Sequence, residues 1–223
     1  MAVPTLDPIT LEVLRHRLWM INDEQGKLAT QISGSPVVYE AKDFNCSLLT
    51  PEGDSFFVGV YTTRLSLCLH VAAKHIIANL KDNPGIRDGD AFITNDPWAG
   101  ASHMNDFLIL APIFWEGEPV AWSGIAMHEM DVGGPNPGSF TVGAKDVFGE
   151  APVIPPVRLV EAGILRRDIE EVVLRNSRTR ELNALNIRAR LAAINRTRER
   201  IHDVIREYGK EVFLEVQKRI LDL

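Results

Sequence analysis

His103, Asp106 and His128 are the residues of this sequence whose types and spacing best suit metal chemistry. Two imidazoles and one carboxylate are a suitable ligand set for a divalent transition metal, and they leave coordination positions open for water or a substrate. Gly, Pro and Asn residues flank both segments, which allows the backbone to turn tightly around them. Taken alone, the spacing is equally compatible with ordinary hydrogen-bonded polar groups in loops.

The elements expected around these residues would bring them together. The segments Phe107–Phe114 and Val120–Met127 have the apolar pattern of strands, and Trp115–Glu118 is expected to be the hairpin turn between them. Asp106 then begins one strand and His128 follows the end of its antiparallel partner, so the two residues come side by side. His103 lies just upstream of Asp106, in the loop that precedes the first of these strands. The pattern therefore predicts that all three side chains converge.

The rest of the chain predicts an α+β fold, with a mixed or antiparallel sheet, flanking helices and a C-terminal helical segment. Asp7 is a suitable cap for the first helix, and Pro8 suits its first position. The expected helices are 7–30, 64–79, 168–175 and 179–208, and the further strands are 44–49, 55–60 and 91–94.

A change of composition predicts how the chain is organised. Prolines at 152, 155 and 156 indicate an extended connector, and the helices after it are rich in Arg and Glu. We therefore expect a metal-binding α+β domain at 1–159 and a helical extension at 160–223. Acidic residues interleave with the arginines, so a solvated face or a subunit interface is favoured over nucleic-acid binding.

Composition and charge exclude several classes of function. The chain has 223 residues, a hydrophobic content of 45% and a net charge of -6. This charge gives no overall attraction to nucleic acid or to an anionic membrane, and the apolar runs are too short to span a bilayer. The sequence shows no signal peptide, and its sparse cysteines, Cys46 and Cys68, fit a reducing compartment. We therefore expect a cytoplasmic protein, with Cys46 as a buried thiol rather than a nucleophile.

Two acidic residues after His128 are candidate catalytic groups. Glu129 could act as a general base on a metal-bound water. Asp131 could be a further ligand, a carboxylate that orients a ligating histidine, or a cap of the following loop. The glycine-rich segment 133–138 lacks the Lys-Ser/Thr ending of a phosphate-binding loop. The sequence therefore predicts no cofactor-binding residues for ATP in this chain.

Nearly the whole sequence resembles the hydantoinase B / 5-oxoprolinase B family, which includes the metal-bearing subunits of acetone and acetophenone carboxylases. The resemblance rests on an ordered set of segments: 7–13, 42–47, 88–90, 95–97, 102–106, 131–134, 137–139, Glu150 and 154–159. Family subunits are considerably longer, so the chain resembles only their N-terminal part. It would be a fragment, a split subunit completed by a separate chain, or a shortened paralogue.

The resemblance implies a division of labour between subunits. A hydantoinase A type partner uses ATP to phosphorylate a carbonyl oxygen, and the B-type subunit handles the activated species at its metal. His103, Asp106 and His128 correspond to the family's metal ligands, with Zn, Mn or Fe as the expected metal. The implied reaction is hydrolysis of a cyclic amide such as a hydantoin, 5-oxoproline or a lactam.

Two departures from the family pattern keep other functions open. Many hydrolase members have a second histidine where this chain has Glu129, and many have a histidine near the position of Thr63. The alternatives are the metal-bearing subunit of an ATP-dependent ketone carboxylase and a non-catalytic assembly subunit.

Overall fold

The computed structural model describes residues 6–222, which fold around one antiparallel sheet. The sheet has seven strands in the order β2-β1-β5-β4-β3-β6-β7. The strands are β1 (Phe44–Leu49), β2 (Ser55–Val58), β3 (Ala91–Thr94), β4 (Asp106–Trp115), β5 (Glu118–His128), β6 (Val157–Glu161) and β7 (Ile164–Leu165). The α+β fold class is confirmed.

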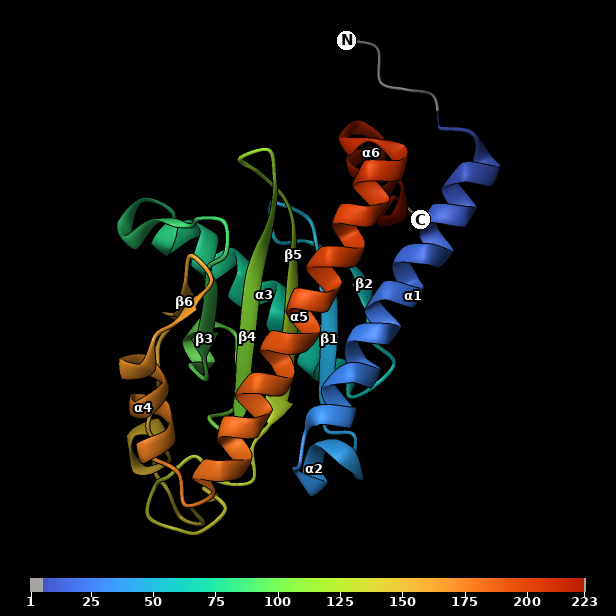
Figure 1. Cartoon of the computed structure of the whole chain (residues 1–223). Helices are drawn as coiled ribbons and strands as arrows, with labels where there is room; N and C mark the ends of the chain where they lie inside the picture. Colours follow the sequence, from blue (N-terminus) through green and yellow to red (C-terminus); the bar gives the residue numbers. More distant parts are fainter. Residues whose placement is uncertain (1–5, 223) are drawn as a thin grey trace.

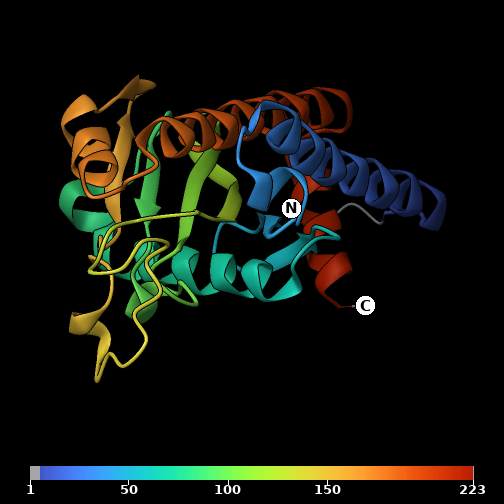
Figure 2. The same cartoon turned by 90° about the horizontal axis from the view of Figure 1, so that it is seen from below.

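Helices cover both faces of this sheet (Figures 1 and 2). The long helices α1 (Pro8–Ile32) and α5 (Arg180–Tyr208) lie side by side on one face, and α3 (Thr63–Leu80) covers the other. The shorter helices are α2 (Pro36–Tyr39), α4 (Arg167–Arg175) and α6 (Lys210–Leu221), and short helical turns occur at Lys81–Gly85, Pro97–Ala99 and Val147–Gly149. Within residues 6–222, none of these helices has the length and hydropathy needed to span a bilayer.

Alternation along the strands builds a core on each side of the sheet, because successive strand residues point to opposite faces. Leu48 of β1 belongs to a buried cluster with Leu14 and Leu18 of α1. Its neighbour Leu49 belongs to a different cluster with Leu65 and Leu69 of α3. Burying each such side chain fully stabilises the fold by about 1.5–3 kcal/mol. The central strands are thereby fixed in position from both sides.

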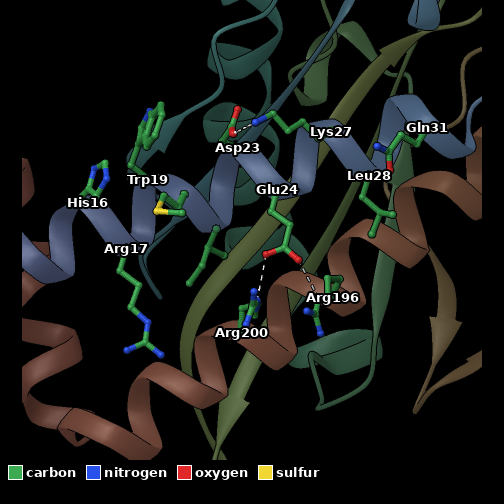
Figure 3. A pocket seen from close by; sticks show the side chains of 12 residues that line it. His16, Arg17, Trp19, Asp23, Glu24, Lys27, Leu28, Gln31, Arg196 and Arg200 are labelled. Atoms are coloured by element: carbon green, nitrogen blue, oxygen red, sulfur yellow. Dashed lines mark hydrogen bonds and ion pairs between the residues drawn. The ribbon is translucent and has the colours of Figure 1, made fainter.

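Ion pairs join α1 to α5 across a surface groove of about 840 Å³ (Figure 3). Glu24 accepts from Arg196 at 3.0 Å and from Arg200 at 3.1 Å. Arg17 pairs with Glu207 at 2.5 Å near the other end of the helices. These arginines are half-exposed, so solvent screens the pairs and each one contributes little to stability. Where it faces α1, the arginine-rich side of α5 thus forms salt bridges to that helix.

The start of the first helix is confirmed in atomic detail. The Asp7 carboxylate accepts hydrogen bonds from the backbone N–H groups of Ile9 and Thr10, both at 3.0 Å.

The strands β6 and β7 were not predicted, because the prolines of 152–156 indicated an extended connector rather than the start of a sheet edge. The strand β6 continues across residue 159, where we expected the metal-binding domain to end, and the division of the chain into two domains stays a prediction.

Candidate metal centre

The β4–β5 hairpin brings Asp106 and His128 together, as the sequence predicted. The two residues are directly paired in the register of the strands. Their side chains meet, with Nδ1 of His128 3.1 Å from Oδ1 of Asp106. The Asp106 side chain is fully buried at the base of the site, whereas the His128 side chain is 21% exposed. The pair therefore joins a buried carboxylate to an imidazole that solvent can reach.

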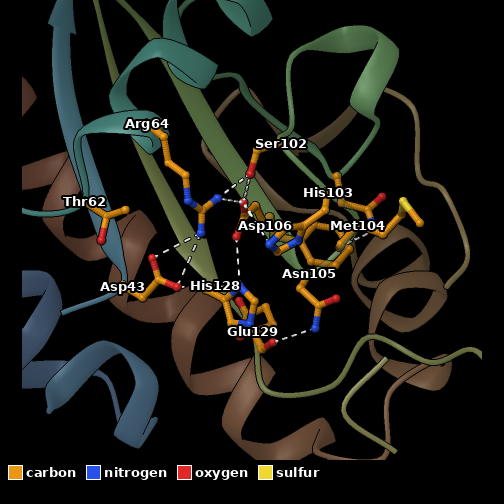
Figure 4. Close-up of polar contacts among 12 residues, drawn as sticks. Asp43, Thr62, Arg64, Ser102, His103, Met104, Asn105, Asp106, His128 and Glu129 are labelled. Atoms are coloured by element: carbon orange, nitrogen blue, oxygen red, sulfur yellow. Dashed lines mark hydrogen bonds and ion pairs between the residues drawn. The ribbon is translucent and has the colours of Figure 1, made fainter. Parts of the chain in front are cut away.

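His103 completes the predicted cluster from the preceding loop (Figure 4). The loop is held by a hydrogen bond from the backbone N–H of Asp106 to the carbonyl of His103, at 3.0 Å. Nε2 of His103 lies 3.6 Å from Oδ2 of Asp106, and one ligand atom from each of His103, Asp106 and His128 lies within 4.8 Å of the others. The structure thus brings together the three residues that the sequence singled out, in a space small enough for one metal ion.

Three residues at this site were not singled out from the sequence. Oδ2 of Asp43 lies 3.8 Å from Nδ1 of His128, and the backbone carbonyl of Asp43 accepts from the His128 N–H at 3.0 Å. Arg64, in the first turn of α3, donates to Oδ2 of Asp106 at 2.7 Å. The Ser102 hydroxyl contacts both Asp106 and the Arg64 guanidinium. Asp43 therefore places a second carboxylate at the rim of the cluster.

The His103 ring provides a test of whether the residues fit a metal. Its Nδ1 is buried and has no hydrogen-bond partner among residues 6–222, and its Nε2 is too far from Asp106 for a hydrogen bond. The buried Nδ1 has lost its hydration without compensation, whereas Nε2 faces the Asp106 carboxylate without bonding to it. A metal ion on Nε2 would join this nitrogen to the Asp106 carboxylate and would leave Nδ1 without a partner. The donor set of two nitrogens and one or two carboxylates suits Zn, Mn or Fe.

The protonation states also suit a metal. Burial lowers the pKa of His103, although Asp106 opposes this shift, so the ring is neutral near pH 7. Burial would raise the pKa of Asp106, but hydrogen bonds from His128, Ser102 and Arg64 lower it overall, so the carboxylate is charged. A neutral imidazole and an ionised carboxylate are the forms that bind metal ions.

Glu129 does not join the cluster. It follows His128 directly, and its carboxylate is buried against α5, where it accepts from Arg190 and from Asn186, each at 2.6 Å. Burial raises the pKa of Glu129, and the Arg190 guanidinium opposes that shift. Because both carboxylate oxygens are engaged by protein groups, the geometry favours a role in positioning β5 over contact with a metal-bound water. The predicted general-base role stays a prediction.

Asp131 also lies outside the cluster, where it anchors the loop that follows β5. Its carboxylate accepts from the backbone N–H groups of Gly133 at 3.0 Å and Gly138 at 2.9 Å. It also pairs with the Arg178 side chain at 3.0 Å. Of the roles considered from the sequence, this geometry favours the loop cap. The loop conformation depends on Gly133 and Gly134, both with positive φ.

Comparison with known proteins places this chain in a protein family. The family model for hydantoinase B/oxoprolinase matches residues 7–223. The chain is 29% identical over 212 residues to 5-oxoprolinase of Dictyostelium discoideum, covering 93% of this chain and 16% of that protein. It is 31% identical over 213 residues to the acetone carboxylase alpha subunit of Xanthobacter autotrophicus, covering 93% of this chain and 27% of that protein.

Solved structures share the fold over almost the whole chain. A nucleotide-free acetone carboxylase superposes with a TM-score of 0.91 at 29% identity, covering 98% of this chain and 29% of that one. The ATP-dependent caprolactamase from Pseudomonas jessenii superposes with a TM-score of 0.90 at 28% identity, covering 97% of this chain and 37% of that one. The chain thus spans less than two fifths of each of these proteins.

Proposed function

The chain belongs to the hydantoinase B/oxoprolinase family, and from this membership we propose that it is the metal-binding part of a B-type subunit in an ATP-dependent cyclic-amide hydrolase. The observation that carries the proposal is the convergence of His103, Asp106 and His128, whose ligand atoms lie within 4.8 Å of one another. These residues would hold one Zn, Mn or Fe ion, with Asp43 as a further oxygen donor. Such an ion lowers the pKa of a bound water or polarises the activated carbonyl.

The partner in this proposal is a hydantoinase A type subunit that uses ATP to phosphorylate the carbonyl oxygen. Relatives named as the acetone carboxylase alpha subunit and caprolactamase subunit beta, and solved structures titled ATP-dependent, support an ATP-using assembly of several subunits. This chain spans 37% of the caprolactamase chain, so the same proposal requires the remainder of a B-type subunit, in the same polypeptide or in a separate one.

The chain's own residues prepare the site in two ways. Arg64 and Ser102 donate to the buried Asp106 carboxylate, which keeps it ionised and oriented towards the histidines. Glu129 and Asp131 act from outside the cluster, because they attach the end of β5 to α5 and to the following loop. We assign these two residues to positioning.

A ketone carboxylase is the second candidate. Similarity to acetone carboxylase, at a TM-score of 0.91, supports the carboxylase. Similarity to the caprolactamase, at a TM-score of 0.90, supports the hydrolase to the same degree. The departure at Glu129 also keeps the carboxylase open, since the family resemblance implies a second histidine at that position in many hydrolase members.

Turnover assays of the assembled complex separate these candidates. The chain would be co-expressed with a hydantoinase A type subunit and any chain completing the B-type subunit. ATP consumption would then be measured with a panel of hydantoins, 5-oxoproline and lactams, and separately with ketones plus bicarbonate. We expect turnover with the cyclic amides, and its loss in Asp106→Asn but not in His75→Ala, a histidine of α3 outside the cluster.

Each other outcome has a defined meaning. Turnover only with ketone and bicarbonate would replace the hydrolase with the carboxylase. A correctly assembled, metal-containing complex that turns over neither panel would favour a non-catalytic assembly subunit.

A further inference from the structure

Arg64 contributes a cation to a site that otherwise suits a metal (Figure 4). One terminal nitrogen of its guanidinium donates to Oδ2 of Asp106 at 2.7 Å and contacts Ser102. The other points to Asp43, with distances of 3.4 and 3.5 Å to the two carboxylate oxygens. The guanidinium thus lies between the two carboxylates of the site.

The contacts of Arg64 leave donor capacity unused. Its side chain is 43% exposed, the bonds to Asp43 are at the long limit for hydrogen bonds, and within residues 6–222 its Nε donates to no group. Arg190 is a contrasting case, since it is 1% exposed and uses all three nitrogens on Asn186, Phe107 and Glu129. Arg190 has the contacts of a structural ion pair, whereas Arg64 retains donors that face solvent at the cluster.

The charge balance of the site changes when a divalent cation binds. Arg64 neutralises one of the two charges on Asp43 and Asp106, so the site carries about one negative charge without a metal. A divalent ion on Asp106 reverses this to about one positive charge, and it weakens the hold of Asp106 on the guanidinium. The site then has an excess positive charge and a planar donor fork next to the metal. That combination recognises an oxyanion with several oxygens.

We propose that Arg64 binds the phosphoryl group of the activated substrate beside the metal. This proposal rests on the proposed function, which supplies a phosphorylated carbonyl as the species that reaches the site. A phosphoryl group offers oxygens to the metal and to the guanidinium fork at the same time. Arg64 is therefore a specificity-determining residue that distinguishes the activated substrate from the unphosphorylated one.

The test measures binding of metal and of inorganic phosphate by the full chain, both by titration calorimetry. The variants are Arg64→Met, which removes the charge, Arg64→Lys, which keeps the charge and loses the fork, and Arg87→Met as a matched control at an exposed arginine. In the Mn-loaded chain, we expect Arg64→Met to weaken phosphate binding by about ten- to a hundredfold, the loss expected for charge-assisted hydrogen bonds. Arg64→Lys should fall between Arg64→Met and the wild type.

The metal titration separates this role from a structural one. Arg64→Met should still bind Mn, because the loss of a donor that orients Asp106 is offset by the loss of a cation that competes for the same carboxylate. Phosphate binding to Mn-loaded Arg64→Met that equals the wild type, or that is weakened equally by Arg87→Met, would overturn the inference and leave the proposed function intact. A wild-type chain that takes up no metal would contradict the proposed function as well.

Discussion

Asp106 is the central carboxylate of the candidate metal centre, since it lies against His103, His128, Arg64 and Ser102. One of its oxygens faces His128 at 3.1 Å and the other accepts from Arg64 at 2.7 Å, while His103 approaches from the loop. Its side chain is fully buried, so these partners determine its charge and direction. The sequence predicted that His103, Asp106 and His128 form the site, because residue types and a hairpin can be recognised from local sequence patterns. Asp43 and Arg64 were not predicted, since they reach the site only when β1 and α3 pack against β5.

Cys46 is expected to be chemically inert in the folded protein. It is fully buried, its Sγ donates to the backbone carbonyl of Asn22 at 3.3 Å, and burial raises its pKa to about 12. The reactive thiolate forms only as the pH approaches that value, so at about pH 8 the thiol remains protonated. Iodoacetamide should leave Cys46 unmodified in the native chain and alkylate it in guanidinium chloride, as read by peptide mass spectrometry. Alkylation of Cys46 in the native chain would revive a nucleophilic role for it.

At the scale of elements, the β4–β5 hairpin could be predicted from the sequence, but the packing of its end against α5 could not. The turn after Trp115 and the apolar pattern of both strands fixed the register that pairs Asp106 with His128. The side of the sheet that Glu129 faces depends on the alternation at the end of β5 and on α5, which lies far away in the sequence. The burial of Glu129 against Arg190 is therefore a tertiary feature that local patterns do not reveal.

Glu129→Ala should destabilise the fold by about 3–5 kcal/mol, because it leaves the Arg190 guanidinium buried without its counter-charge. The free energy of unfolding would be measured by urea denaturation. The double variant Glu129→Leu/Arg190→Met should lie closer to the wild type, since both charges are then absent. Unchanged stability of Glu129→Ala would contradict the positioning role and favour the predicted general base.

At the scale of the whole molecule, the C-terminal helices cover the same sheet that carries the candidate metal centre. Buried residues of α5 such as Ile187 and Ala193 share a core cluster with Met127 of β5, and Ile201 shares another with Leu48 of β1. We nevertheless propose that the outer surface of the helical segment is an interface. Its arginines at 188, 196 and 200 pair within the chain but stay half-exposed, so their remaining donors could extend these ion pairs to a partner.

Cutting the chain after Leu159 should expose the apolar face that α5 covers. We expect such a protein to bind a hydrophobic dye, to lose cooperative unfolding and to assemble more weakly with its partner. A shorter deletion after Leu221 retains every helix and serves as the control, with cooperative unfolding preserved. If the chain cut after Leu159 stays soluble, keeps its metal and binds its partner with wild-type affinity, the role of these helices is wrong.

The metal content of the purified chain tests the central claim most directly. After incubation with Mn or Zn and removal of free metal, elemental analysis should find about one ion per wild-type chain. His103→Ala and His128→Ala should each lose it while keeping a wild-type circular dichroism spectrum, and His75→Ala should retain it. A wild-type chain that contains no metal after this treatment, or a His103→Ala/His128→Ala double variant that binds it as the wild type does, would contradict the account.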